Sequence, residues 1–192
     1  MLRLSVCLAL LAGVCALRAR PIVAGQVHAP KDPKPEAKAA TNLAREIHHQ
    51  LLLLPYYSVF DSISFALNGN KVTLTGQVVR PTLRANAEAA IKTIEGVETV
   101  VNQIEVLPAS PSDDELRRAV YRAIFEDPTL AAYAVQAVPP IHIVVKNGNV
   151  SLEGWVNSAA DKNLAGSRAN AVAEALSVKN NLVVQPKAGA AE

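Results

Sequence analysis

Apolar and polar residues alternate twice along this chain in nearly the same pattern. Each alternating stretch is interrupted by an Asn-Gly pair, at Asn68-Gly69 and at Asn147-Gly148. Asparagine and glycine tolerate the positive φ that a tight hairpin turn requires. We therefore predict two β-hairpins, each with one apolar face that another element must cover. The alternating apolar positions are Ile63, Phe65, Leu67, Val72 and Leu74 in the first copy, and Ile141, Ile143, Val145, Val150 and Leu152 in the second.

Helical periodicity precedes and follows each predicted hairpin. Apolar residues recur at helical spacing between Thr41 and Pro55, and threonine is a residue type that caps helices. After the first hairpin, Pro81 suits a first helical turn and Gly96 suits a helix end. A further apolar strand follows each second helix. We predict helices at residues 41–54, 82–94, 113–126 and 158–175, with third strands at 97–107 and 178–184.

This order of elements, α-β-β-α-β repeated once, predicts an α+β protein with two tandem domains. In each domain, two helices would cover one face of a three-stranded mixed sheet, because each hairpin has a single apolar face. The chain has 192 residues, half of them apolar, which is enough for two small cores. We expect the domains at residues 41–107 and 112–185, joined by a linker at 108–111.

The N-terminal residues have the pattern of a secretory signal. Arg3 is followed by an uncharged apolar run from Leu4 to Leu17 and then by small residues. The run is shorter than the roughly 20 apolar residues of a membrane-spanning helix. An uncleaved anchor or a buried N-terminal helix is the alternative. We expect export to the periplasm, with a signal peptide at residues 1–24, a flexible Pro- and Lys-rich tether at 25–40 and a disordered tail at 186–192.

Removal of the signal changes the charge and the cysteine count. Arg3, Arg18 and Arg20 lie within residues 1–24, so sixteen of the nineteen basic side chains would remain against seventeen acidic ones. A nearly neutral mature protein does not indicate a nucleic-acid partner. Both cysteines, Cys7 and Cys15, lie in the signal, which leaves no disulfide or thiol chemistry. A lipid anchor at Cys15 is the lesser alternative, because Val14 directly before it fits such a site poorly.

The segments around each turn resemble a known bacterial module. The first copy has Asn68-Gly69 followed by Val-Thr-Leu-Thr-Gly-Gln-Val at 72–78, an alanine-rich helix, and Glu-Gly-Val-Glu-Thr-Val-Val-Asn-Gln-Ile at 95–104. The second copy has the corresponding run at 146–154 and a final strand at 178–184. Together they resemble tandem BON domains, which occur in osmotically inducible and envelope-maintenance proteins. Copy two departs from the pattern in lacking the glycine equivalent to Gly96 and in an insertion around 133–140.

The resemblance implies a non-enzymatic, transport-associated envelope protein in osmotic stress or outer-membrane maintenance. Its partners would be a membrane phospholipid surface or envelope proteins. The alternative is a protein-interaction or chaperone-like periplasmic scaffold that recognises clients through exposed sheet edges and does not bind lipid.

The first helix of the second copy carries the candidate binding face. Its apolar stripe leaves cations and aromatic rings at positions i, i+3, i+4 and i+7 on a neighbouring face. Cations beside aromatics can hold a lipid headgroup while a ring enters the interface. The alternative is a solvated face whose arginines pair with Asp113, Asp114 and Glu126, while the rings pack on the other domain. The candidate residues are Arg118, Tyr121, Arg122 and Phe125, with Arg117 close enough to contribute.

One tryptophan and four glycines complete the candidate positions. Trp155 follows the hairpin glycine where copy one has Gln77. An exposed tryptophan there would anchor a membrane or a partner, and a buried one would fill a gap between packed units. The glycines are expected to serve turns and strand ends; they are Gly69, Gly76, Gly148 and Gly154.

No residue pattern indicates catalysis, a cofactor or a metal. His48 and His49 are adjacent on a predicted helix, so their side chains diverge by about 100° and cannot share one ion. Carboxylates such as Glu95 and Glu153 have no neighbouring acid or base in the sequence. The glycines form no phosphate-binding loop, and no serine has the spacing of an activated nucleophile. We expect a binding protein and no enzyme.

Overall fold

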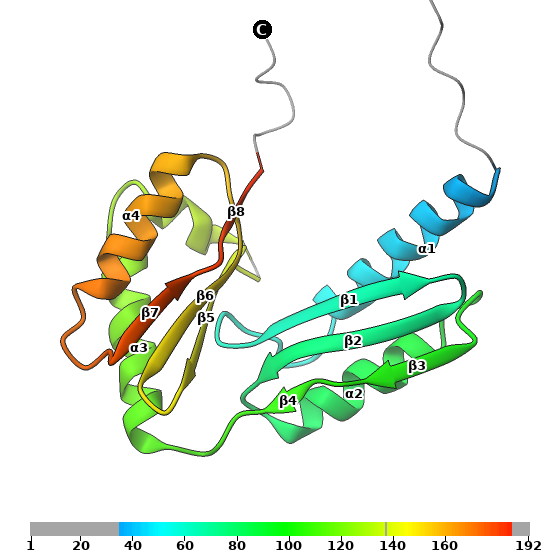
Figure 1. The fold of residues 1–192 in the computed structure, drawn as a ribbon, viewed down its shortest axis with the longest axis horizontal. Coiled ribbons are helices and arrows are strands. Elements are labelled where there is room, and N and C mark those ends of the chain that lie inside the picture. Colours follow the sequence, from blue (N-terminus) through cyan, green and yellow to red (C-terminus); the bar gives the residue numbers. More distant parts are fainter. Residues whose placement is uncertain (1–34, 137, 186–192) are drawn as a thin grey trace, which may run out of the picture. The chain divides into compact units, whose positions relative to one another are not determined.

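A computed structural model describes residues 35–136 and 138–185, with side chains from residue 38 onward. The described residues belong to one unit, which contains both repeats. The first repeat has two helices and a sheet in which β1 and β2 are antiparallel, while β3 and β4 run parallel to β2 (Figure 1). Its elements are α1 (Pro35–Leu52), β1 (Ser62–Asn68), β2 (Lys71–Val78), α2 (Pro81–Lys92), β3 (Thr99–Asn102) and β4 (Glu105–Val106).

The second repeat has the same plan with one additional helical turn. β5 and β6 are antiparallel, and β7 and β8 run parallel to β6. The α+β class and the two mixed sheets are therefore confirmed. Its elements are α3 (Pro111–Phe125), the 3-10 helix η1 (Ala131–Val135), β5 (Ile141–Lys146), β6 (Asn149–Val156), α4 (Ala159–Asn170), β7 (Ser177–Asn180) and β8 (Val183–Val184).

Each repeat has its own hydrophobic core between its helices and one face of its sheet. The alternating strand residues Val72 and Leu74 are buried in the first core, and Val150 and Leu152 are buried in the second. Helix residues at three- and four-residue spacing meet them from the other side. Val59, which lies between α1 and β1, belongs to the second core although it precedes the first hairpin.

The two hairpin turns differ although their sequences are alike. In the second repeat the turn residues are Asn147 and Gly148, both with positive φ (51° and 75°), as a type I′ turn requires. In the first repeat, β1 continues through Asn68 and the turn is Gly69-Asn70. Only Gly69 has a positive φ there (59°), which is the pattern of a type II′ turn. The expected Asn-Gly turn is therefore shifted by one residue in the first repeat.

The predicted third strands are interrupted. Asn102 ends β3, and its side-chain oxygen accepts a hydrogen bond from Ile104 N at 3.1 Å, while its amide group donates to Arg84 O in α2 at 2.9 Å. Asn180 does the same between β7 and β8, with Leu182 N at 3.3 Å and Lys162 O in α4 at 2.7 Å. An asparagine side chain that bonds its own backbone competes with the strand ladder. The bend in each third strand is thus a repeated feature.

Helix boundaries differ from the predicted ones by up to six residues. α1 begins at Pro35, within the expected tether, because proline suits a first turn and the residues after it are mostly helix formers. α2 ends at Lys92 and α4 at Asn170, before the predicted residues 94 and 175. Ser158 caps α4 by accepting a hydrogen bond from Asp161 N. The predicted signal, most of the tether and the tail lie outside the described residues. Within the described residues, no helix is long and apolar enough to cross a bilayer.

Candidate functional site

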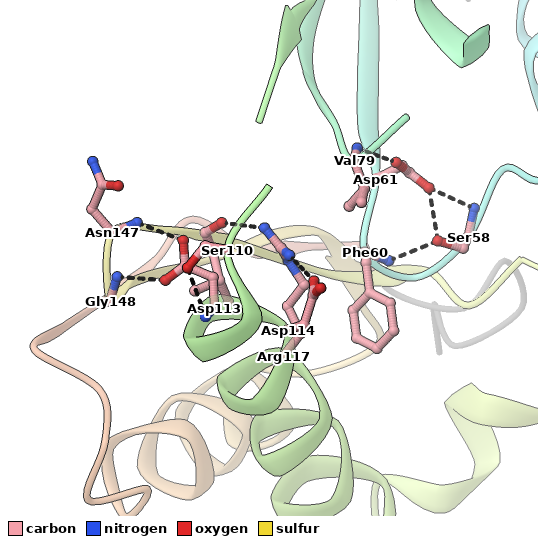
Figure 2. A network of polar contacts seen from close by, with 11 residues as sticks. Ser58, Phe60, Asp61, Val79, Ser110, Asp113, Asp114, Arg117, Asn147 and Gly148 are labelled. Carbon is pink, nitrogen blue, oxygen red and sulfur yellow. Dashed lines mark hydrogen bonds and ion pairs between the residues drawn. The ribbon is translucent and has the colours of Figure 1, made fainter. Parts of the chain in front are cut away.

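The N-terminus of α3 is tied to the hairpin turn of its own repeat. Ser110 caps the helix by accepting from Asp113 N at 3.2 Å. The buried carboxylate of Asp113 accepts hydrogen bonds from Asn147 N at 2.8 Å and Gly148 N at 2.9 Å (Figure 2). These contacts place the first turn of α3 beside the β5–β6 turn. A negative charge in the first helical turn is also favourable for the helix dipole.

Arg117 is not part of an exposed face, contrary to the prediction. The residue is 3% exposed. Its guanidinium forms an ion pair with Asp114 and donates to Val145 O at 2.7 Å, at the edge of β5. A buried cation requires such partners because desolvation is costly. Arg117 therefore holds α3 against the sheet and is unavailable to a ligand.

The aromatic half of the predicted face is also turned inward. Phe125 is 7% exposed and belongs to the second core. Tyr121 is half-buried, with its ring 4.8 Å from that of Phe125 and 6.1 Å from that of Phe60. Phe125 lies close to the apolar stripe of α3, which explains its burial. We conclude that neither ring forms an exposed lipid anchor.

Arg118 and Arg122 remain exposed on one side of α3. Both line an open groove of about 850 Å³ beside the β5–β6 turn. Among the described residues, no acidic side chain forms an ion pair with either guanidinium, so the predicted pairing with Asp113, Asp114 or Glu126 does not occur for these two. Leu176 also lines the groove and is 78% exposed. The site thus has two unpaired cations and one exposed apolar side chain, and the exposed carboxylates of Glu115 and Glu174 also line it.

Trp155 is half-buried and lies in a different groove. Its neighbours there include Tyr57 and His142. The imidazole of His142 stacks on the ring of Tyr57 at 5.6 Å, and its buried Nδ1 has no hydrogen-bond partner in the described part of the chain. Burial lowers the pKa of His142 from its ordinary value of 6.5, although the Asp61 carboxylate and the backbone groups of Ser58 and Asp61 oppose this effect. His142 is therefore neutral at neutral pH.

We predict that the folded state loses stability as the pH falls below about 6.5, because the unfolded chain binds a proton at His142 more readily than the folded chain does. The stability that comes from keeping His142 neutral is fully present at a pH above the ordinary pKa of 6.5. It is lost as the pH falls toward the lowered pKa of the folded state. Thermal unfolding between pH 7.5 and 5.0 would measure it. His142→Gln should flatten the profile, and His48→Gln, an exposed control, should not. Superimposable profiles for wild type and His142→Gln would contradict the prediction.

Asp61 organises the segment between α1 and β1. Its buried carboxylate accepts from Ser58 N at 3.1 Å, Ser58 Oγ at 2.7 Å and Val79 N at 2.8 Å (Figure 2). In this conformation Val59 O accepts from Ile143 N of β5 at 2.7 Å. The sequence did not indicate these roles for Asp61 or Asp113. The only signals were a serine three residues before each carboxylate and, for Asp113, its place in a first helical turn.

The buried carboxylates of Asp61 and Asp113 have structural roles. In residues 35–136 and 138–185, no three side chains of the types His, Cys, Asp or Glu gather where they could hold a metal ion. Asp61 and Asp113 are both engaged by backbone amides, so neither is placed to exchange a proton with a substrate. The two unpaired arginines are the charged groups that best fit a ligand.

Comparisons with known proteins identify both repeats. The family model described as BON domain matches residues 39–108 and 112–186. No curated protein matches the chain. Among solved structures, two from Chlamydia trachomatis are similar, described as CdsD, a structural protein of the type III secretion system, and as its C-terminal domain. The first is 13% identical and covers 77% of this chain and 94% of its own, with a TM-score of 0.32. The second is 15% identical and covers 76% and 98%, with a TM-score of 0.27.

Proposed function

The chain belongs to the BON-domain family, which supports a non-enzymatic, envelope-related role, and from this premise we propose that it binds anionic phospholipid surfaces of the envelope through α3. The observation that carries the proposal is the pair Arg118 and Arg122, exposed and without an ion-pair partner in the described chain. Export by residues 1–24 would bring the protein to such a surface. Osmotic stress and outer-membrane maintenance are the settings that the family suggests.

The proposed contact uses charge first and apolar insertion second. Arg118 and Arg122 lie one helical turn apart, so both guanidinium groups can face the same lipid phosphates. Each cation near an anionic surface contributes about 1 kcal/mol. Leu176, on the connection between α4 and β7, would enter the headgroup region beside them. Such an attachment is weak and reversible, which suits a module present in two linked copies.

Vesicle sedimentation tests this contact. The double variant Arg118→Glu plus Arg122→Glu should bind vesicles of phosphatidylglycerol and phosphatidylcholine at least ten-fold more weakly than wild type, because the loss of about 2 kcal/mol is joined by repulsion. Wild type should bind pure phosphatidylcholine poorly. The expected binding to anionic vesicles should also fall when salt is raised, since screening weakens contacts at an exposed surface.

A matched control carries the same change of charge elsewhere. Arg45→Glu plus Arg84→Glu alters two exposed arginines of the first repeat. This double variant should leave binding within about two-fold of wild type, because neither arginine lines the groove beside the β5–β6 turn. Equal losses in both double variants would show a nonspecific charge effect. Wild-type binding that ignores lipid charge would remove the lipid proposal.

A further inference from the structure

The edge of the second sheet is closed by side chains and loops of this chain. In a hairpin with a two-residue turn, the pairs nearest the turn are hydrogen-bonded and alternate pairs point their backbone groups outward. On β5 the outward groups therefore belong to Ile141, Ile143 and Val145. Ile143 N donates to Val59 O at 2.7 Å, and Val145 O accepts from Arg117 at 2.7 Å. Outward backbone groups of β5 at Ile143 and Val145 are thus already hydrogen-bonded within this chain.

The corresponding edge of the first sheet is open. The register places the outward backbone groups of β1 on Ile63, Phe65 and Leu67. Ile63 N donates to Tyr57 Oη at 3.4 Å, a long contact, and no described residue bonds the outward groups of Phe65 or Leu67. An edge strand with free donors and acceptors is a template for another strand. The corresponding edge strand is therefore covered in the second repeat and exposed in the first.

A groove lies beside the open edge of β1 at residues 62–65. Its volume is about 730 Å³, within the range of about 300–1,000 Å³ that is usual for binding sites. The end of α1 and β1 form one wall, with Leu53 62% exposed and Phe65 half-buried. Pro140, His142 and Trp155 line the other side. The lining is mostly apolar, and the strand edge adds backbone polar groups to it.

We infer that this groove binds an extended peptide segment with apolar residues at alternate positions, which pairs with β1 as an additional strand. A peptide is favoured over an acyl chain because an acyl chain cannot bond the outward amides and carbonyls of Phe65 and Leu67. Alternate apolar side chains of the added strand would point to the same side as Phe65 and meet the apolar wall of the groove. This function is separate from lipid binding by α3.

Hydrogen exchange on the full chain tests strand addition directly. The probe is the peptide Lys-Thr-Val-Thr-Val-Thr-Val-Lys with blocked termini. On saturation, the amides of Phe65 and Leu67 should exchange at least ten-fold more slowly, because they become bonded. The amides of Ser64 and Ala66 already face β2 and should not change. Trp155, the single tryptophan of the chain, gives an independent measure of occupancy through its fluorescence.

Two exposed leucines provide matched variants. Leu53→Asp places a charge in the groove and should weaken peptide binding at least ten-fold while leaving vesicle binding unchanged. Leu176→Asp, at a comparably exposed leucine outside this groove, should leave peptide binding unchanged. Neither leucine is buried, so both variants should fold.

Four outcomes would overturn the inference. The first is no saturable change in Trp155 emission with the probe. The second is a change in emission without slower exchange at Phe65 and Leu67, which would show occupancy without strand pairing. The third is equal affinity for the probe and for its analogue methylated on every central backbone nitrogen. A loss of vesicle binding in Leu53→Asp with retained peptide binding would instead assign the groove to lipid.

Discussion

Replacing Gly76 by alanine is expected to destabilise the first repeat by about 3 kcal/mol. Gly76 has a φ of 120°, which an L side chain adopts only with strain, and an added Cβ would lie 2.0 Å from Ser62 O of the neighbouring strand. Backbone strain of this kind costs about 1–2 kcal/mol, and forced overlap in a packed region costs about 1–3 kcal/mol. The obstacle is a backbone oxygen of β1 at the end of the β1–β2 pairing that lies away from the turn, so it cannot simply rotate away.

Urea unfolding of the wild type and the variant would measure the loss. Gly69→Ala is the matched control, since Gly69 also has a positive φ but its added Cβ would meet open space. That change should cost about 1 kcal/mol, which is the backbone strain alone. Gly154→Ala should reproduce the large effect in the second repeat, because its Cβ would lie 2.0 Å from Pro140 O. Similar costs for Gly76→Ala and Gly69→Ala would contradict the steric argument.

Asp113→Ala should destabilise the second repeat by about 3 kcal/mol. The variant leaves Asn147 N and Gly148 N without their buried acceptor, 2.8 Å and 2.9 Å from the carboxylate in the wild type. Hydrogen bonds to a charged group contribute about 1.5–3 kcal/mol each, and an unsatisfied buried donor costs about 1–3 kcal/mol. The carboxylate also closes the contact between two segments 34 positions apart in the sequence.

Chemical unfolding and amide exchange at the β5–β6 turn would measure this effect. Glu115→Ala is the control, because Glu115 lies in the same helix, is exposed and has no ion-pair partner among the described residues. It should cost less than about 0.5 kcal/mol. Faster exchange at Asn147 and Gly148 in Asp113→Ala alone would support the role of the carboxylate. A loss below about 1 kcal/mol would show that water replaces it.

Positions that recur in both repeats reveal which features the fold requires. Gly76 and Gly154 both bring a strand backbone against the preceding segment, and Asn102 and Asn180 both bend the third strand. Asp113 and Arg117 have no such counterpart among the contacts described for residues 38–107. They bind the turn and the edge of the second sheet. The two repeats therefore share the residues that shape the strands, and they differ in the contacts that cover the edge of each sheet.

The predicted binding face was partly wrong for a definable reason. Helical spacing placed Arg117, Arg118, Tyr121, Arg122 and Phe125 near one another on a helix surface, and α3 does form. Helical spacing does not indicate which parts of the helix surface other elements of the fold cover. Tyr121 meets Phe60, a residue from before the first hairpin, and Arg117 meets the edge of β5. Only Arg118 and Arg122 remain exposed.

By itself the sequence determined the features that arise between near neighbours. The alternation of apolar residues, the turn residues and the helix periodicity act within a few positions, so the duplicated α-β-β-α-β order, the hairpins and the resemblance to the BON family followed from them. Only the tertiary structure decided what meets across long distances in the chain. The burial of Arg117 depends on a carbonyl 28 positions away, and the closing of the β5 edge depends on Val59. The cost of desolvation and the need for hydrogen-bond partners depend on which groups are close in space. The local spacing of residues in the sequence does not indicate which distant residues become neighbours.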